Sequence, residues 1–288
     1  MTDNNLTCRL CHHACQLSEG ETGFCRARGN RGGRLVSLSY GLVTSVALDP
    51  VEKKPLYHFY PGSRILSVGS FGCNLACPFC QNYSISQAGV PDLCFDEGEP
   101  GLRVYKLLPE ELLALALDTR EKRGNIGVAF TYNEPLMNYE YVRDSAKLLH
   151  EAGLKVVLVT NGTLSAGPFA KLLPLIDALN IDLKGFTPEF YEWVGGDLEL
   201  VLANIRAAHG AGCHVEVTTL VIPGHNDSTE EMRQEAQWLS ALSPEIPLHL
   251  SRYFPRYRLG EPATPVETLQ ELREMAGKYL HHVYLGNV

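Results

Sequence analysis

The sequence lacks the features that mark membrane-spanning, secreted and nucleic-acid-binding proteins. No apolar run approaches the roughly 18–20 residues that a transmembrane helix needs. The N-terminus lacks the basic-then-apolar pattern of a signal peptide. Lysine and arginine form no cluster, and the net charge is −8, which argues against nucleic acid or an anionic membrane as a partner. We therefore expect an intracellular, cytoplasmic protein with neither of these partners.

Cysteine is the residue type that stands out. The chain has 288 residues, 45% of them hydrophobic, so it can bury a core without disulfides. Nine cysteines in an intracellular protein therefore indicate metal or redox chemistry. Cys94 and Cys213 stand alone and are expected to be small buried apolar residues. The other seven fall in two tight groups, Cys8, Cys11, Cys15 and Cys25, and Cys73, Cys77 and Cys80.

The first 62 residues differ in pattern from the rest. Residues 1–33 are rich in Cys, Gly and Arg without periodicity, which predicts a loop-rich segment held by a metal. The alternation over residues 34–48 predicts a β-hairpin, and residues 49–62 form a connector punctuated by Pro and Gly. We therefore expect a Cys-rich, metal-binding and β-hairpin extension over residues 1–62.

Over residues 63–288, β-branched runs alternate with amphipathic stretches. This alternation predicts a parallel α/β sheet, and about six βα units favour a partial (β/α)6 TIM barrel. In such barrels the active site lies at the carboxyl ends of the strands. The expected strands are 65–70, 126–132, 155–161, 178–184, 214–222 and 247–254, with 283–286 as a further candidate. The expected helices lie near 108–122, 138–152, 165–175, 198–211, 228–241 and 265–279.

The second cysteine group follows the first barrel strand with the spacing C-x3-C-x2-C. A structural zinc site with a distant fourth ligand is one interpretation, because zinc usually takes four protein ligands. A [4Fe-4S] cluster held through three of its irons is the other, and it leaves the fourth iron open to a small molecule. The spacing favours the cluster at Cys73, Cys77 and Cys80.

With Phe79 in the aromatic position, this stretch resembles the C-x3-C-x-aromatic-C motif of the radical SAM superfamily. The resemblance implies an oxidoreductase on a partial barrel, with a [4Fe-4S] cluster and S-adenosylmethionine (SAM) as cofactors. In that family the reduced cluster passes an electron to SAM, and the resulting 5′-deoxyadenosyl radical takes a hydrogen atom from substrate. The resemblance also implies an electron donor such as flavodoxin or ferredoxin, and a role for Phe79 beside the cofactors.

Polar residues at later strand ends fit the same resemblance. TYNEP, residues 131–135, matches the family's Gly-Gly-Glu-Pro motif at its last two positions, which implies that Glu134 contacts the SAM amino group. TNG, residues 160–162, lies where the family contacts ribose, which implies a ribose contact for Thr160 or Asn161. DLK resembles the activating-enzyme branch and implies that Lys184 meets the SAM carboxylate, oriented by Asp182. Each of these stretches also has an ordinary structural interpretation. Glu134 can be a solvated carboxylate, TNG can be a turn, and Asp182 with Lys184 can be a strand-end ion pair.

The last barrel strands carry fewer signals. His249 on an apolar strand is expected to be a satisfied core residue. Arg252 and Tyr253 are candidate substrate contacts.

The sequence resembles two branches of the radical SAM superfamily. One is the glycyl-radical activating enzymes of the pyruvate formate-lyase type. The other is the radical SAM component of the AmmeMemoRadiSam system, which nearly the whole chain resembles. Those enzymes occur alongside Memo-family and AMMECR-domain proteins, which the resemblance implies as partners. The substrate, protein or small molecule, stays open. The matching stretches are LCHHAC, GFCRAR, DPVEKKPLYHFYPGS, SVGSFGCNLACPFCQNYSISQ, TYNEP and HVYLGN.

The N-terminal cysteines predict a second metal site. Four thiols can bind structural zinc or an auxiliary iron–sulfur cluster, and His12 or His13 can replace one thiol. Zinc would make the segment a structural unit, whereas a cluster would make it an electron relay. A zinc-binding structural or adaptor protein on a barrel scaffold is the alternative from a different class. The four ligands are Cys8, Cys11, Cys15 and Cys25.

Overall fold

The computed structural model describes residues 5–96 and 99–288. Within these residues the largest sheet has eight strands in the order β16-β15-β14-β13-β12-β11-β7-β6. Neighbours from β7 to β16 are parallel, and β6 runs antiparallel to β7. The partial barrel is therefore confirmed. Its strands are β6 (Ser45–Pro50), β7 (Arg64–Gly69), β11 (Asn125–Phe130), β12 (Lys155–Thr160), β13 (Ala178–Asp182), β14 (His214–Val221), β15 (Leu248–Arg252) and β16 (Val283–Gly286).

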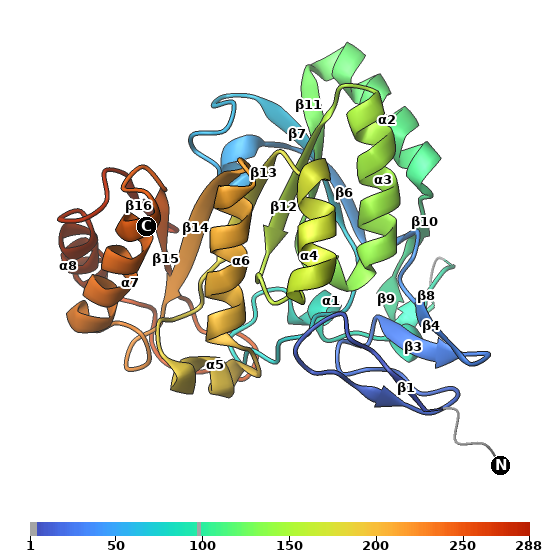
Figure 1. Ribbon diagram of the computed structural model, residues 1–288, viewed down its shortest axis with the longest axis horizontal. Helices are drawn as coiled ribbons and strands as arrows, with labels where there is room; N and C mark the ends of the chain where they lie inside the picture. Colours follow the sequence, from blue (N-terminus) through green and yellow to red (C-terminus); the bar gives the residue numbers. More distant parts are fainter. Residues whose placement is uncertain (1–4, 97–98) are drawn as a thin grey trace.

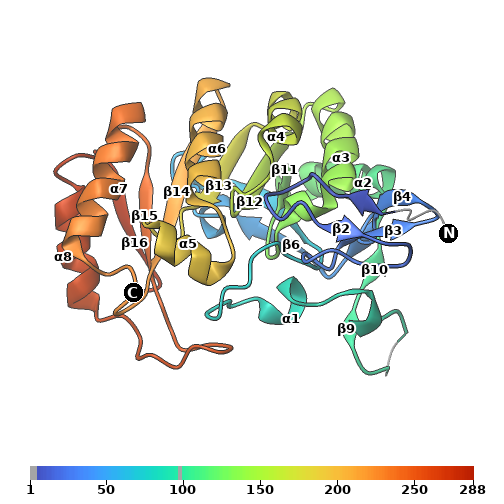
Figure 2. The ribbon, with the colours of Figure 1, turned by 60° about the horizontal axis from the view of Figure 1, so that its bottom comes forward.

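The connecting helices lie along the outer side of the curved sheet (Figures 1 and 2). Local sequence sets their ends: the first long helix begins at Pro109 and ends before Gly124, which has φ +68°. A short helix at residues 188–194 was not predicted; the Thr187 side chain caps it by accepting the Phe190 N–H. The α-helices are α1 (Tyr83–Ser86), α2 (Pro109–Arg123), α3 (Tyr139–Glu151), α4 (Ala166–Leu172), α5 (Pro188–Val194), α6 (Leu198–Gly210), α7 (Thr229–Leu242) and α8 (Val266–Ala276). The 3-10 helices are η1 (Val51–Lys53), η2 (Val90–Asp92), η3 (Pro135–Asn138) and η4 (Leu173–Leu175).

The predicted hairpin over residues 34–48 is wrong in position. The hairpin is instead formed by β3 (Arg28–Arg31) and β4 (Arg34–Ser37). Its two turn residues are glycines with φ +62° and +68°, the conformation that a two-residue hairpin turn needs. The alternating run after β4 divides between β5 (Leu42–Val43), which pairs with β10 (Tyr105–Lys106), and β6 of the large sheet.

The remaining short strands pair as β1 (Leu6–Thr7) with β2 (Gln16–Leu17), and β8 (Leu93–Cys94) with β9 (Leu102–Arg103). Because β6 belongs to the large sheet, the N-terminal segment and the barrel share a strand. The division of the chain after residue 62 stays a prediction.

The two ends of the barrel are covered by different segments. The N-terminal strands lie at the carboxyl ends of the barrel strands (Figure 1), where the Ser165 N–H donates to the Leu10 carbonyl over 2.9 Å. The connector between β6 and β7 covers the opposite end. Its Val51, Leu56 and Phe59 are buried in a cluster with apolar side chains of the sheet. This connector therefore forms the floor of the barrel.

In the described part of the chain, no helix is both long enough and apolar enough to cross a membrane.

Candidate functional site

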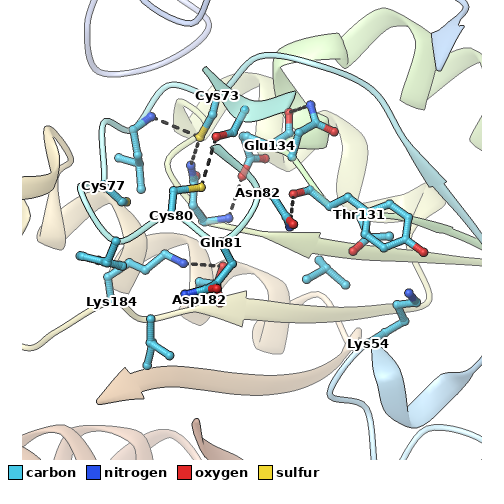
Figure 3. A pocket seen from close by; sticks show the side chains of 18 of the residues that line it. Lys54, Cys73, Cys77, Cys80, Gln81, Asn82, Thr131, Glu134, Asp182 and Lys184 are labelled. Atoms are coloured by element: carbon cyan, nitrogen blue, oxygen red, sulfur yellow. Dashed lines mark hydrogen bonds and ion pairs between the residues drawn. The ribbon is translucent and has the colours of Figure 1, made fainter. Parts of the chain in front are cut away.

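A cavity of about 320 Å³ lies at the carboxyl ends of the barrel strands. Figure 3 shows its lining, with the three clustered cysteines on one side. The loop after β7 contributes the cysteines, and the ends of β11, β12 and β13 contribute polar side chains. All eight residues predicted for the cluster and SAM line this cavity: Phe79, Cys73, Cys77, Cys80, Glu134, Asn161, Asp182 and Lys184.

The cysteine loop is held at its start by Asn133. The Asn133 amide accepts the Ser70 N–H over 3.0 Å and donates to the Phe71 and Gly72 carbonyls over 3.1 and 3.0 Å. Gly72 has φ +84°, and a Cβ there would lie 2.5 Å from the Cys25 carbonyl oxygen. The comparison of TYNEP with the family motif gave Asn133 no role. The available signal was an amide side chain directly before Glu134.

The three thiols form a donor set that fits an iron–sulfur cluster. Burial raises the pKa of Cys73 well above its usual value, and nearby Glu134 and Cys77 add to this. Burial likewise raises the pKa of Cys77 to about 12, although Lys184 opposes the shift. Thiolates are the metal-binding form, so these buried thiols need a cationic centre in order to ionise. Three soft donors beside an open cavity suit a [4Fe-4S] cluster with one iron free.

Glu134 is a buried carboxylate at the end of β11. Its Oε1 accepts from the Leu136 N–H (3.0 Å) and the Thr160 hydroxyl (2.8 Å), and its Oε2 accepts from the Asn161 N–H (2.7 Å). Burial raises the pKa of Glu134 to about 7 against the effect of these hydrogen bonds. A carboxylate has about four acceptor positions. One position is therefore left to accept from a bound ammonium.

Asp182 and Lys184 form an ion pair of 2.8 Å at the end of β13. Burial opposes the lysine charge, but Asp182 and then Cys77 raise the pKa of Lys184 overall. The Lys184 backbone is fixed, because its N–H donates to the Tyr191 hydroxyl (3.1 Å) and its carbonyl accepts from Asn226 (2.9 Å). The lysine is therefore a positioned cation beside Cys77 and not a solvated surface ion pair.

Asn161 and Phe79 also face the cysteine loop. The Asn161 amide donates to Asn74 Oδ1 over 3.0 Å, and its nitrogen lies 3.7 Å from Cys73 Sγ. Phe79 is buried against Trp193, with ring centroids 5.4 Å apart. A ribose contact for Asn161 stays a prediction.

Two expectations for β15 have different outcomes. His249 is buried, and its Nε2 lies 2.6 Å from Glu216, as expected of a satisfied core residue. The candidate substrate contacts Arg252 and Tyr253 are hydrogen-bonded to the following loop, and a substrate contact stays a prediction for both. Arg252 donates to the Thr264 carbonyl and Tyr253 to the Leu259 carbonyl, and neither residue is part of the cavity lining.

The N-terminal cysteine segment lies directly against the cysteine loop. The Cys73 N–H donates to the Cys25 carbonyl over 3.2 Å, and His13 Nε2 lies 2.8 Å from the Asn74 carbonyl. Burial raises the pKa of Cys11 to about 11 and also raises that of Cys25. Across residues 5–96 and 99–288, no three His, Cys, Asp or Glu side chains are arranged around a single metal ion. Zinc and an auxiliary cluster both stay open.

Sequence comparison identifies the family. Residues 67–236 match the model of the radical SAM superfamily. The chain belongs to the radical SAM superfamily. Enzymes of this family use a [4Fe-4S] cluster and SAM, and they need a reductant and a substrate.

Related proteins extend this result. A protein of Methanocaldococcus jannaschii with no assigned function is 39% identical over all of this chain and 83% of its own length. The pyruvate formate-lyase-activating enzyme of Clostridium pasteurianum is 27% identical over 61% of this chain and 69% of its own. A radical SAM methyltransferase structure from Sphaerobacter thermophilus shares the fold, with a TM-score of 0.60 and 20% identity over 79% of this chain and 67% of its own.

The cavity also contains residues that sequence reasoning did not assign. Lys53 and Lys54, from the floor of the barrel, and Tyr132, beside Glu134, line it together with the cysteines. The paired lysines within the connector were the available signal, but nothing local to them indicated that they reach the barrel interior.

Proposed function

We propose that this radical SAM protein is an oxidoreductase that binds a [4Fe-4S] cluster through Cys73, Cys77 and Cys80 and cleaves SAM reductively. The observation that carries the proposal is one cavity that combines three thiols of a single loop with a carboxylate and a lysine. When bound, the reduced cluster would supply one electron to the SAM sulfonium, whose S–C5′ bond would break to give methionine and the 5′-deoxyadenosyl radical that abstracts hydrogen from substrate.

The protein's own groups then have binding and positioning roles. Glu134 accepts a hydrogen bond from the SAM ammonium at its remaining acceptor position. Lys184 binds the SAM carboxylate, and Asp182 holds the lysine in place through their 2.8 Å ion pair. Phe79 forms an apolar wall, and Asn161 contacts the ribose. Together these groups orient SAM and exclude water while the cofactors supply the chemistry.

We assign the protein to the AmmeMemoRadiSam type. The supporting observation is that the resemblance includes LCHHAC and HVYLGN, which lie outside the matched family segment 67–236. This assignment implies Memo-family and AMMECR-domain proteins as partners, and flavodoxin or ferredoxin as the electron donor.

A glycyl-radical activating enzyme is the second candidate. It is favoured by similarity to activating enzymes, including the benzylsuccinate synthase activating enzyme of Thauera aromatica, 29% identical over 39% of this chain and 35% of its own. An EPR-visible glycyl radical on a glycine-loop peptide would distinguish this candidate from the first.

Anaerobic reconstitution tests the proposed chemistry. The parent protein should be brown and should form 5′-deoxyadenosine from SAM after dithionite reduction. Cys77→Ala should lose 5′-deoxyadenosine formation, because two protein thiolates then remain for the cluster. Cys213→Ala removes a buried thiol that donates to the Ile176 carbonyl outside the cavity, and it should keep the activity. A colourless, zinc-only parent that is inert toward SAM would favour the adaptor alternative.

The same samples identify the N-terminal metal. Iron and zinc are counted separately in the parent and in Cys11→Ala. Loss of zinc alone in the variant assigns structural zinc, and loss of iron assigns an auxiliary cluster.

A further inference from the structure

The cavity continues from the cysteines to the floor of the barrel. Figure 3 shows Lys54 at the far side of the lining from the three cysteines, with Glu134 and Thr131 among the residues between them. Lys54 follows η1, and its side chain is only 3% exposed. A buried lysine is unusual, since burial of an ammonium requires compensation by charge or hydrogen bonds.

The ammonium of Lys54 is only partly compensated by protein groups. Its Nζ lies 2.9 Å from Asp49 Oδ2, and among the described residues this is its one hydrogen-bond acceptor. An ammonium has three N–H donors. Asp49 is shared, because it also pairs with Lys53 over 3.3 Å and accepts the Tyr132 hydroxyl over 2.9 Å.

The charges around Lys54 also favour an additional anion at this end of the cavity. Lys53 and Lys54 both pair with Asp49, but the Lys53 side chain is 66% exposed and its charge is screened by water, so the buried cation is Lys54. Burial lowers the pKa of Lys54 even though Asp49 opposes the shift. An additional anion in the cavity would therefore stabilise the ammonium.

Tyr132 provides a second, independent observation. It has φ +74°, a backbone conformation that is unfavourable for residues other than glycine. Its ring lies 4.7 Å from Lys54 Nζ, and Gly69 leaves room for it, because a Cβ there would come within 2.7 Å of the ring. The Tyr132 carbonyl is held by Asn82 of the cysteine loop over 2.7 Å. Such strain is concentrated at functional sites.

We propose that Lys54, with Lys53 and beside the Tyr132 ring, is the substrate-binding end of the cavity and takes a small molecule with an anionic oxygen group, a carboxylate or a phosphate. This inference rests on the proposed function, because it places the substrate in the cavity that holds the cluster and SAM. A buried ammonium suits a small anion better than the glycine loop of a protein, whose peptide groups carry no charge.

Anion binding to the reconstituted protein with SAM tests the inference. The probes are inorganic phosphate and succinate, each added at constant ionic strength, with the thermal unfolding midpoint as readout. At least one probe should raise the midpoint of the parent. Lys54→Met should weaken the apparent affinity for that probe about tenfold or more, because a charged hydrogen bond is lost. The probe that acts identifies the anionic group as phosphate or carboxylate.

The matched control is Lys122→Met. Lys122 is also paired with an aspartate, Asp118, but on the exposed surface of α2, and its removal should leave the anion response unchanged. Equal responses of the parent and Lys54→Met would overturn the inference. So would a parent that responds to neither probe, or one that responds only to a glycine-loop peptide.

A second variant covers the case in which Lys54→Met does not fold. Lys54→Arg keeps the charge that pairs with Asp49, so it should keep the anion response of the parent. Loss of the response in Lys54→Arg, with 5′-deoxyadenosine formation intact, would overturn the inference. Failure of the proposed function is distinguishable, because it appears as a parent that forms no 5′-deoxyadenosine, whatever its response to anions.

Discussion

At the scale of single residues, the site depends on side chains that bind the backbone of another segment. Asn133 is the clearest case, because one amide satisfies an N–H and two carbonyls at the start of the cysteine loop. The sequence predicted the thiols, since spacing along one loop is local information. It did not predict their support, because the pairing of Asn133 with residues 70–72 depends on β7 and β11 being neighbours.

Asn133→Ala should therefore destabilise the protein by about 1–3 kcal/mol, because it leaves buried backbone groups without partners. Iron incorporation at the three cysteines should fall with it. Urea unfolding and iron content measure the two effects. Asn133→Asp keeps an acceptor for the Ser70 N–H but loses the donors to the carbonyls, so it should not restore either quantity. Parental stability in both variants would contradict this role.

At the scale of elements, the parallel strands were predicted well and the N-terminal hairpin was not. Strand–helix alternation can be predicted from the local periodicity of hydrophobic residues. The segment 34–48 also alternates, but its two halves pair with different strands. The Gly-Gly turn pairs β4 with β3, and the edge of β7 pairs with β6. Packing between elements also shifts titration. Glu235 of α7 is buried against β14, accepts the Thr219 hydroxyl over 2.6 Å, and has its pKa raised by burial to about 8.

This shift makes stability fall with rising pH. The folded protein keeps the Glu235 proton up to about pH 8, whereas the unfolded chain loses it near its ordinary pKa of 4.5. The free energy of unfolding should therefore decrease between these values, by at most about 1.4 kcal/mol per pH unit from this group. Glu235→Gln should flatten the decrease in urea unfolding from pH 5.5 to 8.5. Glu271→Gln, on the exposed face of α8, should keep the parental slope, and an equal slope in all three proteins would contradict the assignment.

At the scale of the whole molecule, the N-terminal segment is fixed to the barrel beside the site. Arg28 of β3 is buried and forms two hydrogen bonds, of 2.6 and 2.8 Å, with the Glu140 carboxylate of α3. The Cys73 N–H and the Ser165 N–H donate to carbonyls of the same segment. The two cysteine groups, far apart in the sequence, are thereby neighbours.

Glu140→Gln should loosen this contact, because it leaves the Arg28 charge buried without its partner. We expect the free energy of unfolding to fall by about 1–3 kcal/mol. This is less than for a fully buried ion pair, because Glu140 is partly exposed. Arg28→Met should cost less, because the remaining carboxylate reaches water. Urea unfolding and limited proteolysis of the N-terminal segment show which variant loses more stability. A larger loss in Arg28→Met than in Glu140→Gln would contradict the argument.

The sequence by itself determined the barrel, the cysteine loop and the polar strand ends, because periodicity and motif spacing are properties of short segments. The family match bears out the membership that those segments implied. Only the tertiary structure decided that β6 joins the large sheet, that Asn133 fixes the cysteine loop, and that Lys54 lies over the Tyr132 ring in the cavity. These contacts join segments distant in the sequence, and they exist only because the barrel brings the floor and the strand ends around one cavity.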